Sequence, residues 1–137
     1  MDVKDKVIVV TGAGQGLGRQ FALDCASEGT RVALADLNLE TVEKVAAECI
    51  KAGGKARPYQ MDVTSEKEVV GFYDHVVKDF GSLDASINNA GILRDDLLVK
   101  EKDGEVVTFP LKKWQAVKEF QQNLCVLLTR QQHLNSL

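Results

Sequence analysis

A glycine-rich segment near the N-terminus constrains this chain more than any other feature. The segment reads Thr11-Gly12-Ala13-Gly14-Gln15-Gly16-Leu17-Gly18 and lies between an apolar run at 6–11 and apolar residues at helical spacing over 17–28. A strand that turns through glycines into a helix is the setting in which such a motif binds phosphate. In that setting the exposed amides of residues 16–18 and the positive end of the helix dipole favour an anion. The alternative interpretation is a compact loop without a ligand.

Three glycines of the segment have separate expected tasks. Gly12 permits the tight turn, Gly16 lets the backbone approach a pyrophosphate, and Gly18 lets the helix pack closely on the strand. Gln15 and Leu17 occupy turn positions between these glycines. The segment is therefore predicted to be the phosphate-binding turn of a dinucleotide-binding strand–helix–strand unit.

Strands and helices alternate along most of the remaining chain. Further strands are predicted at 31–36, 55–61 and 83–88. The intervening helices are predicted to begin at caps on Asn38 and Thr64 and to stop at Gly53-Gly54 and Gly81. Four strands that alternate with helices indicate a parallel sheet joined by right-handed crossovers.

The regular alternation breaks after Gly91. Residues 92–110 are predicted to form a hairpin-like insertion with Asp103-Gly104 at its turn. A C-terminal helix is predicted at 111–132, because Pro110 suits a first turn and an apolar stripe follows it. The chain shows no internal repeat or linker, so 1–137 is predicted to be one domain. The expected fold class is α/β, a Rossmann-type doubly wound parallel sheet truncated after about four strands and four helices.

Asp36 indicates which dinucleotide the turn should hold. It ends the second predicted strand, 18 residues beyond Gly18, and the dinucleotide fold places a carboxylate about 20 residues on to bind the adenosine ribose. The same carboxylate would repel a 2′-phosphate, and neither Leu37 nor Gln15 offers a positive charge to reverse that. NAD(H) is therefore predicted over NADP(H). The alternative is an ordinary aspartate at a strand end.

Composition argues against several other classes of function. The net charge is −3 without long blocks of one sign, which argues against nucleic acid or an anionic membrane as a partner. No apolar run is long enough to cross a bilayer, and the mixed-charge N-terminus is unlike a signal peptide. Cys25, Cys49 and Cys125 are far apart, which predicts buried or half-buried thiols in a reducing cytoplasm and no metal site.

Together these motifs resemble the classical short-chain dehydrogenase/reductase family. The resemblance rests on the glycine turn, Asp36, Asp62-Val63 after the third strand and Asn88-Asn89-Ala90-Gly91 after the fourth. Residues 91–95 and 114–117 look like the bacterial 3-oxoacyl-acyl-carrier-protein reductase branch. The resemblance extends to about Arg130. It implies an oxidoreductase that transfers hydride between nicotinamide and a carbonyl or alcohol substrate.

The resemblance also implies roles for the segments that follow the third and fourth strands. Asp62-Val63 would flank the adenine ring. Asn89-Ala90-Gly91 would line the ribose and the diphosphate, and Asn88 would tie strands together. An ordinary turn is the alternative interpretation of the last segment, because Asn and Gly both favour turns.

The catalytic chemistry of the family needs a serine, a Tyr-x-x-x-Lys pair and a helix asparagine. Tyr59 and Tyr73 have Val63 and Val77 four residues on, so neither has a lysine on the same helix face. Both tyrosines also precede the fourth strand, whereas the family's pair follows it. Neither is therefore predicted to be the catalytic tyrosine.

The helix asparagine has two candidate positions. Aligned from Trp114 without a gap, its position is occupied by Gln121, whereas a two-residue shift places Asn123 there. These positions point about 200° apart on a helix, so both cannot serve.

The chain is therefore expected to represent the cofactor half of such an enzyme, binding NAD(H) without turnover on its own. Without a fifth strand, the edge of the fourth strand would carry unpaired amides and carbonyls. A homo-oligomer through that edge or the 111–132 helix is expected, because exposed edges and apolar patches favour association. One alternative is a non-catalytic nucleotide- or partner-binding module derived from the family; another is a remnant that has lost the cofactor.

Overall fold

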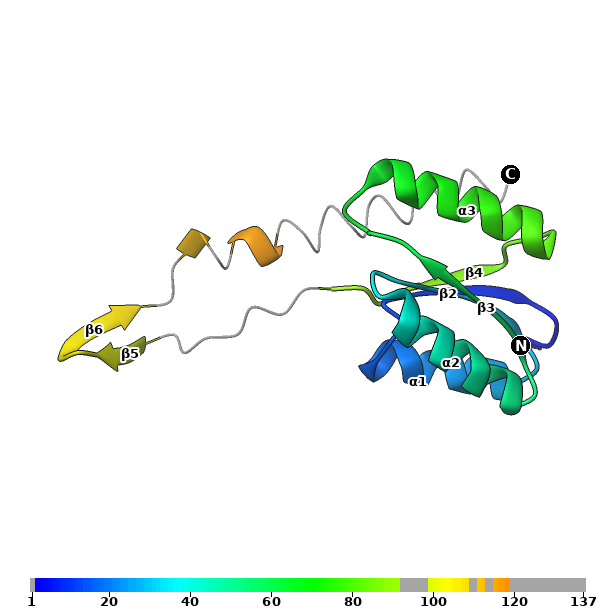
Figure 1. The fold of residues 1–137 in the computed structure, drawn as a ribbon, viewed down its shortest axis with the longest axis horizontal. Coiled ribbons are helices and arrows are strands. Elements are labelled where there is room, and N and C mark those ends of the chain that lie inside the picture. The colour runs from blue at the N-terminus through cyan, green and yellow to red at the C-terminus, as the bar shows by residue number, and fades with distance from the viewer. Residues whose placement is uncertain (1, 92–98, 109–110, 113–114, 119–137) are drawn as a thin grey trace.

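The computed structural model of this chain describes residues 2–91, 99–108, 111–112 and 115–118. Its centre is a parallel sheet with helices on both faces (Figure 1). The strands of this sheet are β1 (Val7–Thr11), β2 (Arg31–Asp36), β3 (Lys55–Gln60) and β4 (Ala85–Asn88). They lie in the order β3-β2-β1-β4, and each neighbouring pair is parallel. The predicted α/β fold with a doubly wound parallel sheet is confirmed.

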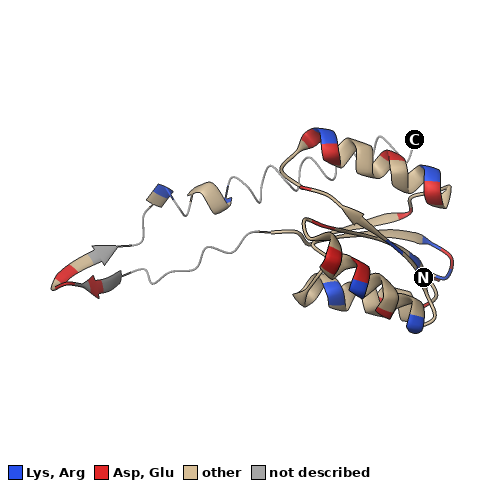
Figure 2. Ribbon diagram, in the orientation of Figure 1, with Lys and Arg blue, Asp and Glu red and all other residues tan. Residues whose placement is uncertain are grey.

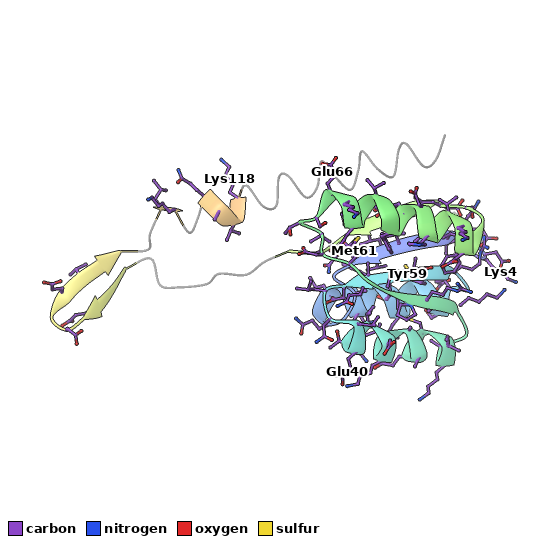
Figure 3. All side chains as sticks on the ribbon, turned by 45° about the horizontal axis from the view of Figure 1, so that its top comes forward. Lys4, Glu40, Tyr59, Met61, Glu66 and Lys118 are labelled. Carbon is purple, nitrogen blue, oxygen red and sulfur yellow. The ribbon has the colours of Figure 1, made fainter. Side chains whose placement is uncertain are left out.

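Helices cover both faces of the sheet. α1 (Gly16–Ser27) and α2 (Leu39–Lys51) lie on one face, and α3 (Glu66–Phe80) lies on the other (Figure 1). The labelled side chains of Glu40 on α2 and Glu66 on α3 accordingly lie on opposite sides of the domain (Figure 3). Acidic and basic residues are interspersed on the helices (Figure 2), as expected for faces that meet water.

Side-chain caps set the starts of α2 and α3. Asn38 caps α2 as predicted, because its Oδ1 accepts a hydrogen bond from a first-turn amide at 3.3 Å. The prediction of Thr64 as the cap of α3 is wrong by one residue, since Ser65 Oγ accepts from the Glu68 amide at 3.4 Å. Thr64 is engaged elsewhere because its amide and hydroxyl both donate to Asp62 Oδ1, at 2.9 and 2.7 Å.

The central strand β1 is apolar on both sides because it is covered on both sides. Val7 and Val9 pack in a core with α3, whereas Ile8 and Val10 pack in a second core with α1 and α2. These four side chains are at most 7% exposed. A parallel strand between two helical layers requires such an unbroken apolar run. Burial therefore fixes β1 in the middle of the sheet and sets where the glycine turn begins.

A two-stranded hairpin follows the sheet in sequence. β5 (Val99–Lys102) pairs antiparallel with β6 (Glu105–Thr108). Asp103 and Gly104 form the turn with φ angles of 54° and 80°, the positive values that a two-residue hairpin turn of this type requires. Residues 111–112 and 115–118 are helical. The rest of the predicted 111–132 helix lies outside the described residues.

Two buried threonines differ in whether their hydroxyls are satisfied. Both side chains are fully buried, but Thr30 Oγ1 has no hydrogen-bond partner among the described residues. Thr11 Oγ1 accepts from the Ala90 amide at 3.1 Å. An unsatisfied buried hydroxyl costs about 1–3 kcal/mol, so we expect Thr30→Val to raise the free energy of unfolding by about 1 kcal/mol. Thr11→Val should lower it in the same urea denaturation, and a Thr30→Val variant less stable than the parent would contradict the expectation.

Candidate functional site

The candidate site lies at the carboxyl ends of the sheet strands. Because the four strands are parallel, the segments 12–18, 36–37, 62–63 and 89–91 all follow strand ends at one edge of the sheet. Backbone hydrogen bonds join neighbouring segments. Ala13 donates to the Ala35 carbonyl at 3.1 Å, and Met61 donates to the Asp36 carbonyl at 2.9 Å. Met61 marks this end of the domain in Figure 3, and Lys4 marks the other.

The strand order places a switch point beside the glycine turn. The chain leaves β1 toward β2 on one side, and β4 lies on the other side of β1. In open α/β sheets, ligands bind outside the carboxyl ends of the strands at such a switch point. The turn after β1 and the turn after β4 meet there, so both belong to one candidate site.

Close contact between these two turns explains Gly12. This residue has a φ of +65°, and a Cβ placed on it would lie 2.9 Å from the Ala90 Cα. Asn89 Nδ2 donates to the carbonyls of Thr11 and Gly12, each at 3.3 Å. The Ala90 amide donates to Thr11 Oγ1 at 3.1 Å. Glycine therefore meets both a conformational and a steric requirement at position 12.

The residue that ties the strands together is Asn89, which corrects the role expected of Asn88. The Asn88 Oδ1 atom accepts from Ser86 Oγ at 2.8 Å, within the same strand. Asn88 is the last residue of β4, whereas Asn89 lies beyond it and reaches across to the carbonyls that follow β1. The Asn-Asn-Ala-Gly segment is thus more than an ordinary turn.

Gly16 and Gly18 meet opposite requirements in the structure. Gly16 has a φ of +57°, and no atom lies within 4 Å of the position its Cβ would take. The space above the start of α1 is therefore open to a ligand. At Gly18, a Cβ would collide with the carbonyl of Gly12 and with the side-chain amide of Asn89. Close packing of α1 against the end of β1 therefore depends on Gly18.

The carboxylate of Asp36 is held at the end of β2 by two backbone amides. Its Oδ2 accepts from the Gly14 amide at 2.9 Å, and its Oδ1 accepts from the Asn38 amide at 3.1 Å. An ionised carboxylate has about four acceptor positions, so each oxygen has room for a further donor. The side chain is therefore fixed beside the glycine turn while it keeps the capacity to bind a diol.

Gly14 is a site residue that the sequence reasoning did not single out. A Cβ at this position would collide with Thr41 Oγ1 and would lie 2.9 Å from Asp36 Oδ2. The Gly14 backbone itself needs no left-handed conformation. Its lack of a side chain instead leaves room for the Asp36 carboxylate. The glycine pattern gives no signal for this role, because the contact joins two separate turns.

Asp62 and Val63 lie at the end of β3, next to Asp36. The hydrogen bonds from Thr64 to Asp62 Oδ1 hold the pKa of that carboxyl below its usual value, so it is ionised at neutral pH. The Asp62 amide donates to Glu68 Oε2 at 2.8 Å, and Val63 packs against the α3-side core. These contacts orient the segment, while its contact with an adenine ring stays a prediction.

Two leucines at this edge of the sheet are largely in solvent. Leu17 at the start of α1 is 70% exposed, and Leu37 directly after Asp36 is 65% exposed. Single exposed leucines are common on protein surfaces. Here, however, both lie at the carboxyl ends of the strands, where a bound planar ring would need apolar contacts.

The pKa values of Tyr59 and Tyr73 are both raised above the ordinary tyrosine value. A tyrosine that transfers protons near neutral pH needs a lowered pKa instead. Tyr73 is fully buried, and burial raises its pKa while its hydroxyl shares a 2.8 Å hydrogen bond with Ser86. Burial also raises the pKa of Tyr59, helped by the Asp79 carboxylate to which it donates at 2.7 Å. A neighbouring lysine would lower a tyrosine pKa instead. These contacts agree with the absence of a Tyr-x-x-x-Lys pair at either tyrosine.

The cysteines of α1 and α2 are packing residues. Cys49 is buried, and burial raises its pKa to about 11. Cys25 is half-buried, and burial raises its pKa as well. Within the described ranges, no cluster of three or more His, Cys, Asp or Glu side chains is placed to hold a metal ion. In the same ranges no helix has both the length and the apolar character needed to cross a membrane.

Three residues of the sequence analysis cannot be placed in this site. Gln121 and Asn123, the two candidates for the helix asparagine, lie outside the described residues, and so does Cys125. The site built above therefore consists of the segments that follow the four parallel strands.

Comparison with known proteins shows which family shares this sequence. The family described as short chain dehydrogenase matches residues 6–134. This chain belongs to that family. The match covers nearly the whole chain, including every segment of the candidate site, so the family resemblance inferred from the motifs is confirmed.

Individual relatives are similar to this chain over part of their own length. A 3-oxoacyl-acyl-carrier-protein reductase of Thermotoga maritima is 37% identical over 109 residues, which cover 78% of this chain and 44% of the relative. Cyclopentanol dehydrogenase of a Comamonas species is 42% identical over 91 residues, covering 66% and 36%. The crystal structure of NAD+-bound xylitol dehydrogenase superimposes with a TM-score of 0.80 at 34% identity, covering 98% and 49%. This chain thus spans about half or less of these proteins.

Proposed function

We propose that this chain binds NAD(H) at the carboxyl ends of its strands and forms the cofactor-binding half of a short-chain oxidoreductase. The observation that carries the proposal is the Asp36 carboxylate, held by the Gly14 amide beside the open start of α1. A dinucleotide needs amides and a positive helix end for its diphosphate and a carboxylate for its adenosine ribose. This edge of the sheet provides both.

The shape of the site supports a dinucleotide. The space above Gly16 is open, and the glycines at positions 14 and 18 carry no side chain that would fill the turn. Leu17 and Leu37 provide exposed apolar surface on the same edge. In the proposal, the carboxylate of Asp36 also disfavours the 2′-phosphate of NADP(H), because no Lys or Arg stands at Gln15 or Leu37 to neutralise it.

Each segment then has a binding task. The amides of 16–18 bind the diphosphate, Asp36 accepts from the ribose hydroxyls, and Asp62-Val63 with Leu37 border the adenine. Asn89-Ala90-Gly91 line the ribose and diphosphate from the β4 side. The nicotinamide, when bound, supplies hydride transfer to or from a carbonyl or alcohol carbon. The residues of this chain bind and orient it.

We further propose that the 137-residue chain alone turns over no substrate. The contacts of Tyr59 and Tyr73 described above leave neither suited to proton transfer at the switch point. Asn123, or Gln121 in the ungapped alignment, would contribute the helix amide that the family uses. In this proposal, the substrate contacts belong to the remainder of such an enzyme, since this chain covers 44% of the Thermotoga maritima relative.

Nucleotide fluorescence titration of the purified chain tests the proposal. We expect NADH to bind with a micromolar dissociation constant and NADPH at least about tenfold more weakly, a difference of about 1.4 kcal/mol. No oxidation or reduction of simple alcohols or 3-oxoacyl thioesters should accompany binding. Folded protein that binds neither nucleotide would overturn the cofactor assignment, whereas measurable turnover would overturn only the claim of inactivity.

Self-association belongs to the same proposal. β4 is the last strand on its side of the described sheet, and its residues are half-buried or exposed, whereas β1 beside it is fully buried. An open strand edge of this kind pairs readily with another chain. Sedimentation velocity at micromolar concentration tests for the expected dimer or larger oligomer.

A cytoplasmic location is also part of the proposal. It rests only on the wide spacing of the cysteines, which is typical of free thiols in a reducing compartment.

A further inference from the structure

A second concave surface lies at the end of the sheet opposite the glycine turn. It is a groove of about 290 Å³ between β3 and the last turn of α3. Its lining residues are Arg31, Lys55, Ala56, Arg57, Asp79 and Phe80, and we call it the basic groove. Arg31 begins β2 and Asp36 ends it, which separates the groove from the candidate cofactor site by roughly 17 Å along the strand.

The register of the sheet brings the cations of the groove together. Arg31 pairs with Lys55, and Ala33 pairs with Arg57. Alternate residues of a strand project to the same face of the sheet, so Lys55 and Arg57 share one face of β3. That face is the one covered by α3, because Arg57 forms an ion pair with Asp79 at 3.1 Å. Three positive side chains therefore line the boundary between the sheet and one helix end.

The single carboxylate among the lining residues is already engaged. Asp79 pairs with Arg57 and also accepts a 2.7 Å hydrogen bond from the Tyr59 hydroxyl. Both contacts keep this carboxyl ionised by holding its pKa below the usual value. Asp79 thus balances one of the three positive charges and leaves two.

Arg31 and Lys55 carry these two unbalanced charges. The Arg31 guanidinium donates to the carbonyls of Asp5 and Phe80, at 2.9 and 2.8 Å, and to the Ser82 hydroxyl at 3.4 Å. All three acceptors are uncharged, and two of the five N–H donors of arginine remain. The Lys55 amide donates to the Thr30 carbonyl at 3.2 Å, but its ammonium group has no hydrogen-bond or ion-pair partner within the described part of the chain. This local excess stands out on a chain whose net charge is −3.

We propose that the basic groove binds a small organic oxyanion, either a carboxylate or a phosphate monoester. The remaining donors of Arg31 and the ammonium group of Lys55 would bind the oxyanion, and a guanidinium presents its donors as a fork that suits two oxygens. Phe80 offers apolar contact to the rest of the ligand. The volume lies at the lower limit for small-molecule sites, and the acidic chain disfavours a polyanion.

Amide chemical shifts followed during titration test this proposal without reference to the cofactor site. The probes are inorganic phosphate and acetate, each added at constant ionic strength to the full chain. We expect the largest shifts at the amides of residues 31, 55, 57 and 80–82. Shifts confined to residues 14–18 would overturn the proposal, because they would place the anion at the start of α1 instead.

Two variants with opposite expected effects make the test sharper. Lys55→Gln should weaken phosphate binding about tenfold, because it removes a charged hydrogen-bond donor from the groove. Asp79→Asn should tighten it, because that carboxylate competes with the ligand for Arg57. Lys44→Gln, an exposed lysine paired with Glu40 on α2, should leave binding unchanged. A Lys55→Gln variant with parental affinity, or an Asp79→Asn variant that binds more weakly while its melting temperature is unchanged, would overturn the proposal.

Discussion

Gly18→Ala is expected to destabilise the domain by about 3 kcal/mol and to abolish measurable NADH binding. The added methyl group would collide with the Gly12 carbonyl and the Asn89 side-chain amide. Neither neighbour moves without cost, because Asn89 bridges two backbone carbonyls. The start of α1 must then shift away from β1, which displaces the amides expected to bind the diphosphate. Thermal unfolding with and without NADH measures both effects on the same sample.

Gly71→Ala is the matched control for this substitution. Gly71 lies inside α3, and no atom lies within 4 Å of the position its Cβ would take. Alanine is the better helix former by roughly 1 kcal/mol, so this variant should be more stable than the parent and should bind NADH equally well. The steric argument fails if Gly18→Ala keeps the parental melting temperature and NADH affinity, or if both variants behave alike.

The sheet could be predicted from sequence because a strand that is buried on both faces consists of consecutive apolar residues. β1 is continuously apolar from Val7 to Val10 and β2 from Val32 to Ala35, and a turn or cap residue stands close to each helix end. The cap of α3 was misplaced because Thr64 and Ser65 are both good caps. The choice between them depends on Asp62, whose carboxylate engages Thr64 and leaves the next residue to cap the helix.

Sequence reasoning predicted the site residues whose role depends on a local motif. It missed those whose role depends on contact between segments distant in sequence. The roles of Gly12, Gly16 and Gly18 could be predicted, because this spacing of glycines between a strand and a helix is typical of a phosphate-binding turn. The contact of Gly14 with Asp36 and the bridge from Asn89 each join residues more than 20 positions apart. Such contacts depend on how β2 and β4 lie beside β1, which local patterns do not specify.

Asp36→Asn should weaken NADH binding at least about tenfold and leave NADPH binding unchanged or improved. The carboxylate now accepts from the amides of Gly14 and Asn38 with separate oxygens. The asparagine amide group has one acceptor oxygen, so one of these donors would face an NH2 group. The variant loses acceptor capacity toward the ribose diol and also the negative charge that repels a 2′-phosphate. A loss of about 1.4 kcal/mol or more in NADH binding follows.

Parallel fluorescence titrations with NADH and NADPH separate this effect from general damage to the fold. Asp74→Asn serves as the control, because it makes the same change of charge at an exposed position on α3, on the other face of the sheet. We expect the ratio of NADPH to NADH dissociation constants to fall for Asp36→Asn and to stay at the parental value for Asp74→Asn. If both nucleotides weaken by the same factor at Asp36, the residue holds the turn in place without selecting the cofactor. An unchanged NADH affinity would remove it from the site altogether.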